Sequence, residues 1–506
     1  MELAFHKETV KYLSESIYDQ IYQEQTAEMT IPEAMPDIGR IVDCFGTVTV
    51  QSKEVETGCL RVTGGIQAGV LYLPEGEETS LKKIEAYLPF TVSKKIQSED
   101  TSTLFYWGWI RSIDARFING RKVLIRANLG SELTLLTPAV LELPEMDDCP
   151  KYLACKSSTY LMRLPICAAE KELQIADEVL MPDQEIGADQ LLKWTCLTEI
   201  TDSRVIGDKA VFKGNLLLRV LYQNEEGELG TWSGSVPFSQ YAELDPVPED
   251  ATPVLQPIFR HAEVETDGQL DSHRLLINIT VTVQILVMGT ISIRLQEDAY
   301  SLRGSFSPEW ESVSLNPCLD LEAKTFTAAV PIPADAERVL DWTAFPDRPT
   351  LVDPMNRDTL DTELSVNLLY YDADRALKGT LIRQKLPTTL MRTEQAECDC
   401  FLNMGGDAQV QSRELRIPMQ VNCLTRKETT YQTLSAGKIE ETDQKNQPSL
   451  IVRFAKGSLW DVAKQNASSV EAIRLVNQLE TEDLTEERML LIPVGEAALS
   501  AKKEEA

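Results

Sequence analysis

The feature that most constrains the fold is a motif that recurs three times along the chain. Gly64–Tyr72 reads GGIQAGVLY, and Gly214–Tyr222 reads GNLLLRVLY at an offset of 150 residues. A third copy, LSVNLLYY, begins at Leu364 and puts Leu369 and Tyr370 at the matching positions. Self-similarity at a fixed spacing indicates units that are built alike. The sequence therefore predicts three related modules.

The segments around each copy repeat as well. A Pro-Phe pair follows the first copy at Pro89 and the second at Pro237, and the third has KLPTTL around Pro387. Upstream, IPEAMPDIGRIVD from Ile31 aligns with LMPDQEIGADQLLK from Leu180, where Pro32 matches Pro182. A looser copy, VPIPADAERVLD, begins at Val330. The units close on RKVLIRANL from Arg121, HRLLINITV from His273 and SRELRIPMQV from Ser412.

The residues within each unit favour strands. Short runs of Val, Ile, Leu, Thr and Tyr alternate with turn clusters such as NEEGE and DADRA. Asn119-Gly120 between two such runs is a strong hairpin signal. In LLINITVTVQILVMG, from Leu275, polar and apolar residues alternate, which predicts a strand with one wet face rather than a membrane span. We expect sandwiches or open barrels.

We therefore expect a multidomain, mainly β protein. Val10, Leu13, Ile17 and Ile21 fall on one helical face and predict an N-terminal helix. A polar stretch with no long period predicts a linker before the C-terminal domain. The predicted division is helix plus first module at 1–140, second module at 165–300, third module at 320–425, linker at 426–448, C-terminal domain at 449–494 and tail at 495–506.

The charge balance restricts the partners. The chain has 49 basic and 79 acidic residues, a formal net charge of −30. Nucleic acids and anionic membrane surfaces require a basic footprint, so the composition disfavours both. The negative charge either keeps the protein soluble or faces a basic partner surface, and the sequence leaves both readings open.

The sequence offers no catalytic or metal-binding pattern. The first residues lack the apolar core of an export signal, and ten scattered cysteines fit a reducing compartment, so we expect a cytoplasmic protein. The cysteines have no zinc-ligand spacing, and His6, His261 and His273 are too dispersed for a metal site or a triad. No nucleophile elbow, HExxH motif or P-loop is present. We predict no cofactor and no enzyme activity.

The pattern changes after Pro448. LIVRFA predicts a strand, Ser458 can cap a helix over SLWDVAKQN, and Ser469 can start a second helix over SVEAIRLVN. MLLIP, from Met489, predicts a closing strand. Leu459, Val462 and Ala463 share one helical face, as do Val470 and Ile473, with Leu475 or Val476 as further inward candidates.

This C-terminal segment resembles a LysM domain over Leu450 to Val494. The resemblance rests on VRFAKGSLWDVAKQNASSVEAIRLVNQL and the closing LLIP. The usual Gly-Asp-Thr of the first loop is Gly457-Ser458 here, and Glu487-Arg488 replaces the Gly before the last strand. LysM domains bind N-acetylglucosamine polymers in a shallow groove between two loops, which match Ala455–Leu459 and Gln478–Glu487. The implied site comprises Lys456, Gly457, Ser458, Leu459, Trp460, Asn477, Leu479 and Glu480.

The chemistry of this implied site permits two ligands. Trp460 lies one residue off the buried face, where it could stack on a sugar, anchor a protein partner or cover the small core. The second loop, LETEDLTEE, crowds five carboxylates together: Glu480, Glu482, Asp483, Glu486 and Glu487. A neutral glycan gains little from carboxylates, whereas a basic protein surface gains association rate; a merely solvated loop is the third reading.

The three modules resemble SPOCS domains, most closely in the first unit, with QEQTAEMTIPEAMPDIGRIVD and GGIQAGVLY. SPOCS repeats followed by one LysM domain resemble the SipL family of clostridial sporulation proteins. The resemblance implies a role in the mother-cell cytoplasm, where the spore coat assembles on the forespore, with the LysM domain docking on the SpoIVA-like ATPase at the coat base. The alternatives are a peptidoglycan-binding protein of the wall or spore cortex, and an enzyme that a glycan binder targets.

Overall fold

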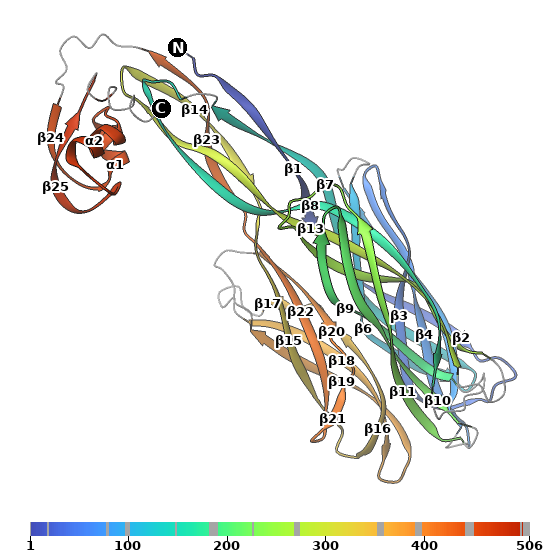
Figure 1. The fold of residues 1–506 in the computed structure, drawn as a ribbon. Coiled ribbons are helices and arrows are strands. Elements are labelled where there is room, and N and C mark those ends of the chain that lie inside the picture. The colour runs from blue at the N-terminus through green and yellow to red at the C-terminus, as the bar shows by residue number, and fades with distance from the viewer. Residues whose placement is uncertain are drawn as a thin grey trace.

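The protein is almost entirely β-structure, with two short helices near the C-terminus (Figure 1). The computed structural model describes residues 2–17, 20–76, 80–96, 102–146, 149–181, 191–224, 227–267, 274–351, 359–389, 397–440, 450–495 and 498. The mainly β, multidomain fold predicted from the sequence is confirmed.

Module 1 and module 2 each pack two antiparallel sheets face to face. In module 1 the sheets are β3 (Ile38–Glu56), β4 (Cys59–Pro74) and β5 (Lys82–Lys95), and β2 (Ile21–Thr30), β7 (Lys122–Met146) and β6 (Thr103–Asn119). In module 2 they are β9 (Leu191–Ile206), β10 (Lys209–Gln223) and β11 (Leu229–Glu243), and β8 (Leu153–Leu180), β13 (Arg274–Ser301) and β12 (Thr252–Thr266).

Module 3 follows the same plan with shorter strands. One sheet contains β16 (Ala336–Pro346), β17 (Thr350–Leu351), β18 (Thr359–Asp372) and β19 (Leu377–Thr389). The other contains β15 (Cys318–Pro331), β20 (Glu397–Met404), β21 (Gln409–Gln411) and β22 (Glu414–Arg426). In every module the two sheets bury a core between their central strands, β4 on β7, β10 on β13 and β18 on β22.

The three copies of the recurring motif fall on equivalent central strands. GGIQAGVLY lies on β4, GNLLLRVLY on β10 and LSVNLLYY on β18. The Pro-Phe pairs and Pro387 lie on the neighbouring strands β5, β11 and β19, and the closing segments lie on β7, β13 and β22. The repeat in the sequence is thus a repeat of position in the sheets.

An arginine explains why the Ile-Pro segment recurs. The Arg121 guanidinium donates to the carbonyl oxygens of Pro32 at 2.9 Å and Met35 at 2.7 Å. In module 3, Arg413 donates in the same way to Pro333 and to Ala334, the latter at 2.8 Å. Each arginine satisfies carbonyl groups of a loop that enters a sheet. The aligned Pro182 and His273 of module 2 lie outside the described residues.

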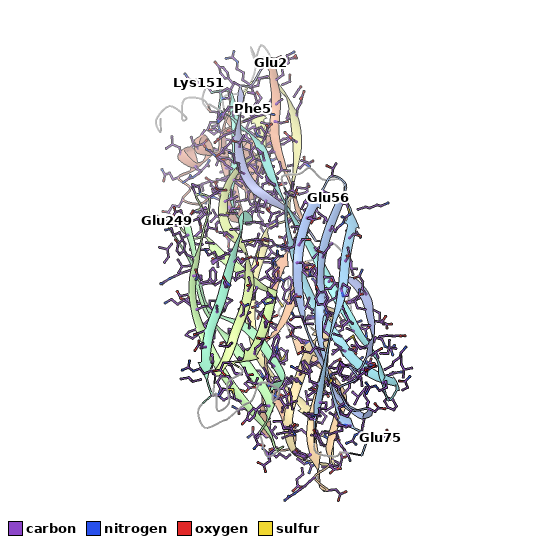
Figure 2. All side chains as sticks on the ribbon, turned by 90° about the vertical axis from the view of Figure 1, so that its right-hand side faces the viewer. Glu2, Phe5, Glu56, Glu75, Lys151 and Glu249 are labelled. Atoms are coloured by element: carbon purple, nitrogen blue, oxygen red, sulfur yellow. The ribbon has the colours of Figure 1, made fainter. Side chains whose placement is uncertain are left out.

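Strands that extend beyond the sandwiches form a stalk. Its three antiparallel pairs are β1 (Phe5–Ile17) with β7, β8 with β13, and β14 (Ser305–Leu315) with β23 (Thr429–Glu440). These pairs run away from the modules toward both chain termini (Figure 1). Figure 2 places Phe5 and Lys151 at the far end of the stalk and Glu75 at the opposite end of the molecule. Leu143, Met162, Ile293 and Val313 belong to a core inside the stalk.

The stalk corrects two predictions. The prediction of an N-terminal helix is wrong, because the segment forms strands β1 and β2, which pair with β7 along their lengths. In β2, half-buried and exposed residues alternate from Ile21 to Thr30, and this period of two is the strand signal that the helical interpretation missed. The prediction of a linker is wrong from Thr429 to Glu440, because these residues form β23, which pairs with β14 and buries Leu434 and Ile439. Residues 441–448 lie outside the described residues.

The three modules meet at one apolar line. In each module a β-bulge precedes the pairing of a first-strand residue with the motif leucine: Asp43 with Leu71, Lys193 with Leu221, and Asp341 with Leu369. A bulge redirects a side chain locally. The bulged residues and their neighbours form a single cluster shared by all three modules, which includes Val42, Leu71, Leu81, Leu192, Leu221, Leu229, Leu340, Leu369 and Leu377.

A buried ion cluster lies beside this line. Lys193 Nζ is 2.6 Å from Asp43 Oδ2 and 2.7 Å from Asp341 Oδ2, and all three side chains are at most 3% exposed. Desolvation opposes the charge on Lys193, but the two carboxylates outweigh it and raise the pKa of the lysine. Desolvation would also raise the pKa of Asp341, yet Lys193 and Arg219 hold it below its usual value. Lys193 and Asp341 therefore stay ionised near neutral pH.

Polar side chains join the modules at other points too. Gln284 of β13 exchanges hydrogen bonds with the backbone N–H and carbonyl of Tyr106, both at 2.9 Å, which joins module 2 to module 1. Arg426 of module 3 is 2.6 Å from Glu15 of β1. The prediction of one wet face for the strand from Leu275 is wrong at Thr282 and Gln284, because module 1 covers that end.

The ion cluster predicts a specific loss of stability. Lys193→Met leaves Asp43 buried without its cation, which costs roughly 3–5 kcal/mol of unfolding free energy. Adding Asp43→Leu to that variant restores part of the loss, because Asp341 keeps Arg219 at 3.1 Å. Urea unfolding followed by circular dichroism measures both. The exposed Lys213→Met on β10 is the matched control, and equal midpoints for it and Lys193→Met would contradict the assignment.

Candidate interaction site

The C-terminal domain folds in the predicted order of strand, helix, helix and strand. Its elements are β24 (Leu450–Ser458), α1 (Leu459–Gln465), α2 (Val470–Asn477) and β25 (Asp483–Pro493), and the strands pair antiparallel. Ser458 caps α1 by accepting from the Trp460 N–H, and Ser469 caps α2 by accepting from the Ala472 N–H, as the sequence predicts.

The apolar faces of both helices enclose a small core. Leu459, Val462 and Ala463 of α1 and Val470 and Ile473 of α2 are buried, which confirms those predictions. Leu475 and Val476 point away from the core instead: they are exposed, and Ala472 is the third buried residue of α2.

Several residues of the implied LysM site serve the fold of the domain. Leu459 is a core residue. Asn477 donates to the carbonyl of Leu491 at 2.6 Å and accepts from the Leu491 N–H at 2.8 Å, which ties the end of α2 to β25. Leu479 packs against the core, and its N–H donates to the Arg474 carbonyl at 3.0 Å after the left-handed Gln478. The left-handed Gln478 and the hydrogen bond from Leu479 together form a Schellman motif, which ends the helix.

Trp460 contacts the stalk. Its Nε1 donates to Asp298 Oδ2 at 2.8 Å, and its ring meets the Tyr300 ring edge-on at a centroid distance of 4.9 Å. Lys464, one turn later, lies 2.6 Å from Asp298 Oδ1. Tyr300 also donates its hydroxyl to the Ser468 carbonyl at 2.8 Å. The end of β13 therefore forms a cradle, Asp298, Tyr300 and Leu302, which holds the C-terminal domain.

Three residues of the implied site remain accessible. Lys456 and Glu480 are exposed, and Gly457 has φ +96° with open space where a side chain would stand. A left-handed φ favours glycine at this turn. The predicted second loop is shorter than expected, because β25 begins at Asp483 and so includes Glu486 and Glu487. The structure thus separates the eight implied residues into four that serve the fold of the domain, Trp460 at the stalk, and three that remain accessible.

The outer face of the β24–β25 sheet is apolar and exposed. Val452, Phe454 and Met489 have 56%, 64% and 57% of their surface exposed, and Leu450 is exposed beside them. Phe454 pairs directly with Met489, so the two side chains share this face. Sequence reasoning missed the face, although LIVRF from Leu450 is apolar at all but one position. Because successive residues of a strand point to opposite faces, one set of these apolar side chains has to face away from the helices.

Comparison with known proteins gives a family match for the middle of the chain. The family profile described as SipL, SPOCS domain matches residues 188–267, which include β9 to β12 of module 2. The chain therefore contains a SPOCS domain. Through this domain it resembles SipL, and that resemblance indicates a role in sporulation. Searches of curated proteins and of solved structures gave no match.

Two further observations concern the described part of the SPOCS-domain protein. No helix within it is long and apolar enough to cross a membrane. No group of three or more His, Cys, Asp or Glu side chains in the same residues could hold a metal ion. The side chains of His6 and His261 are exposed, while His273 lies outside the described residues.

The cradle predicts that Asp298→Ala releases the C-terminal domain. The substitution removes the acceptor of Trp460 and the counter-ion of Lys464 together. We expect a larger radius of gyration in small-angle X-ray scattering and faster hydrogen exchange across α1. Glu297→Ala is the matched control, because Glu297 binds Ser158 within the stalk. Identical scattering from both variants and the wild type would show that the cradle does not hold the domain.

The same contact predicts release in acid. Desolvation raises the pKa of Asp298, but hydrogen bonds from Lys464 and Trp460 outweigh it and lower the pKa from the usual 3.8. A carboxyl with a lowered pKa stabilises docking above its usual pKa, and this contribution disappears as the pH falls through the lowered value. Scattering should therefore detect release below pH 3.8 in the wild type. Asp298→Asn, which cannot ionise, should remove this pH dependence, and an unchanged transition in that variant would assign it to another group.

Proposed function

We propose that this SPOCS-domain protein is a non-catalytic scaffold of spore coat assembly that docks through its C-terminal domain on a SpoIVA-like coat-base ATPase. The SPOCS match supports the setting, and the LysM-like sequence supports the docking domain. The observation that favours a protein ligand is the exposed outer face of β24 and β25, with Val452, Phe454 and Met489.

This outer face has the chemistry of a protein-binding surface. Contiguous exposed apolar groups are unfavourable in water unless another surface covers them, and they mark interaction sites. Phe454 offers an aromatic anchor, and Met489 beside it is flexible enough to fit an irregular partner surface. A sheet face that buried both would gain most of its binding energy from these two residues.

The charges around this face favour a basic partner. Glu486 and Glu487 are exposed on β25 within three residues of Met489, and Glu480 and Glu482 precede them. Arg474 lies 3.4 Å from Glu482. The other three carboxylates are exposed to solvent. Acidic groups at the rim of an apolar contact accelerate association with a basic surface and reject acidic ones. The partner surface should therefore be apolar at its centre and basic at its edge.

The position of Trp460 disfavours a glycan as the main ligand. A sugar ring stacks on an accessible indole face. Here the indole N–H is bound to Asp298 and Tyr300 packs against the ring, so a glycan would compete with the cradle for this side chain. A protein that binds the apolar outer face would not compete with Asp298 and Tyr300 for Trp460.

The rest of the chain supports a scaffold. The modules and the stalk place the C-terminal domain at one end of an elongated body (Figure 1). Such a body can hold one partner at the stalk end while the modules contact others, and several weak contacts on one chain raise avidity. The implied location is the mother-cell cytoplasm at the forespore surface.

Phe454→Ser in the full chain tests this proposal. Loss of an aromatic anchor costs about 2 kcal/mol of binding free energy, which raises Kd about 30-fold. Surface plasmon resonance against the purified SpoIVA-like ATPase measures it. Leu475→Ser is the matched control, since Leu475 is equally exposed but lies on α2, behind the sheet, and should leave Kd unchanged.

A parallel arm presents insoluble peptidoglycan and N-acetylglucosamine oligomers to the same variants. The proposal fails if the wild-type chain does not bind the ATPase, or if Phe454→Ser binds it as tightly as Leu475→Ser does. Binding of the wild type and of Phe454→Ser to the glycan, without binding to the ATPase, would assign the domain to glycan recognition instead.

A further inference from the structure

A cavity of about 280 Å³ lies between module 2 and module 3. One wall is the outer face of the β9–β10–β11 sheet, and the other is β16 with the turn that follows β20. The cavity is larger than the roughly 150 Å³ space that holds a benzene molecule in an engineered protein. Its walls include Thr195, Leu217, Arg219, Trp342, Thr343 and Asp407.

The strand register shows why the cavity exists. Phe45 pairs with Gly69 in module 1, Thr195 with Arg219 in module 2, and Thr343 with Asn367 in module 3. In module 1 the Phe45 ring lies directly over Gly69, so closely that a Cβ there would be 2.2 Å from it. Module 2 has the small Thr195 at the equivalent position. The module 2–module 3 junction therefore lacks the ring that fills the corresponding space beside module 1.

The polar groups of the cavity are arranged around its apolar walls. The Arg219 guanidinium stacks on the Trp342 ring at 3.8 Å and lies 3.1 Å from Asp341 and 3.4 Å from Asp407, so its charge is balanced. Thr343 Oγ1 is buried and has no hydrogen-bond partner among the described residues. A buried hydroxyl without a partner costs free energy that an added donor or acceptor would recover.

Two edge strands border the cavity. Within the described residues, β11 pairs only with β10, and β16 pairs only with β18. Both line the cavity, through Ser233 to Ser235 and through Trp342 to Ala344. Edge strands have backbone groups that a second extended chain can pair with. The Trp342 carbonyl already accepts from Arg219, so a polypeptide gains its backbone hydrogen bonds from the other groups of these two strands, which a free small molecule does not.

We propose that this cavity binds an aromatic side chain of an extended segment of another protein. The chain's own Phe45 shows which group suits this position in the repeat, and Thr343 offers a hydroxyl to the bound segment. Asp407, with 54% of its side chain exposed at the rim, favours a basic residue beside the aromatic one. The site lies in the modules, far from the C-terminal domain, and so goes beyond the function proposed above.

The test uses N-acetyl amides of phenylalanine and tryptophan as probes on the full chain, with N-acetyl-alaninamide as the blank. Saturation-transfer NMR measures binding. We expect saturable binding of the two aromatic amides and none of the alanine amide. Thr195→Phe, which adds an aromatic ring to the wall of the cavity, should weaken binding at least tenfold. Ser239→Phe, at an exposed position of β11 outside the cavity, should leave it unchanged.

A second variant and a second probe pair keep the outcomes separate. Leu217→Trp fills the cavity from the neighbouring strand β10 on the same wall, and thermal unfolding confirms that each variant is folded. Absence of binding by the wild type, or full binding by both folded cavity-filling variants, overturns the proposal. Toluene and indole that bind as tightly as the amides would overturn the assignment to a polypeptide, because the backbone would then contribute nothing. The ATPase-binding result at Phe454 is independent of every one of these outcomes.

Discussion

Lys193, held between Asp43 and Asp341, is the interaction on which the arrangement of the modules depends. The three residues occupy the same position directly after a bulge in three related sheets, each paired with the motif leucine of its own module. Three identical residues could not form this contact, since like charges would repel one another at that distance. The alternation of aspartate, lysine and aspartate therefore favours one chain with three different modules in a fixed order. The leucines around it supply the apolar free energy, and the ions supply the specificity.

The placement of the modules in turn determines the stalk. Once the central strands meet at one line, their continuations run side by side, and the pairs β1–β7, β8–β13 and β14–β23 can share a core. The stalk ends at Asp298 and Tyr300, which hold Trp460 and so orient the C-terminal domain. With the helices facing inward, the sheet face with Phe454 and Met489 is left to solvent. The proposed docking surface is thus a consequence of how the chain is packed at its centre.

Sequence reasoning predicted the elements that depend on local pattern. The three motif copies led to three equivalent central strands, and the caps Ser458 and Ser469 located both helices of the C-terminal domain. Its predictions were wrong where contacts with segments distant in the sequence determine the structure. The stripe from Val10 to Ile21 suits a helix in isolation, and only pairing with β7 makes it two strands. Trp460 was correctly placed off the helix's buried face, but its partners are about 160 residues away in the chain and no local pattern indicates them.

The central claim is that the three modules form one cooperative body around Lys193. Native-state hydrogen exchange under increasing urea, resolved by mass spectrometry, tests it on β4, β10 and β18, the three strands with the recurring motif. Amides whose exchange requires global unfolding share one opening free energy and one dependence on denaturant. We predict that the three strands converge on a single opening reaction. Three separate opening free energies, each unaffected by loss of the other modules, would show independent domains on a string and would contradict this account.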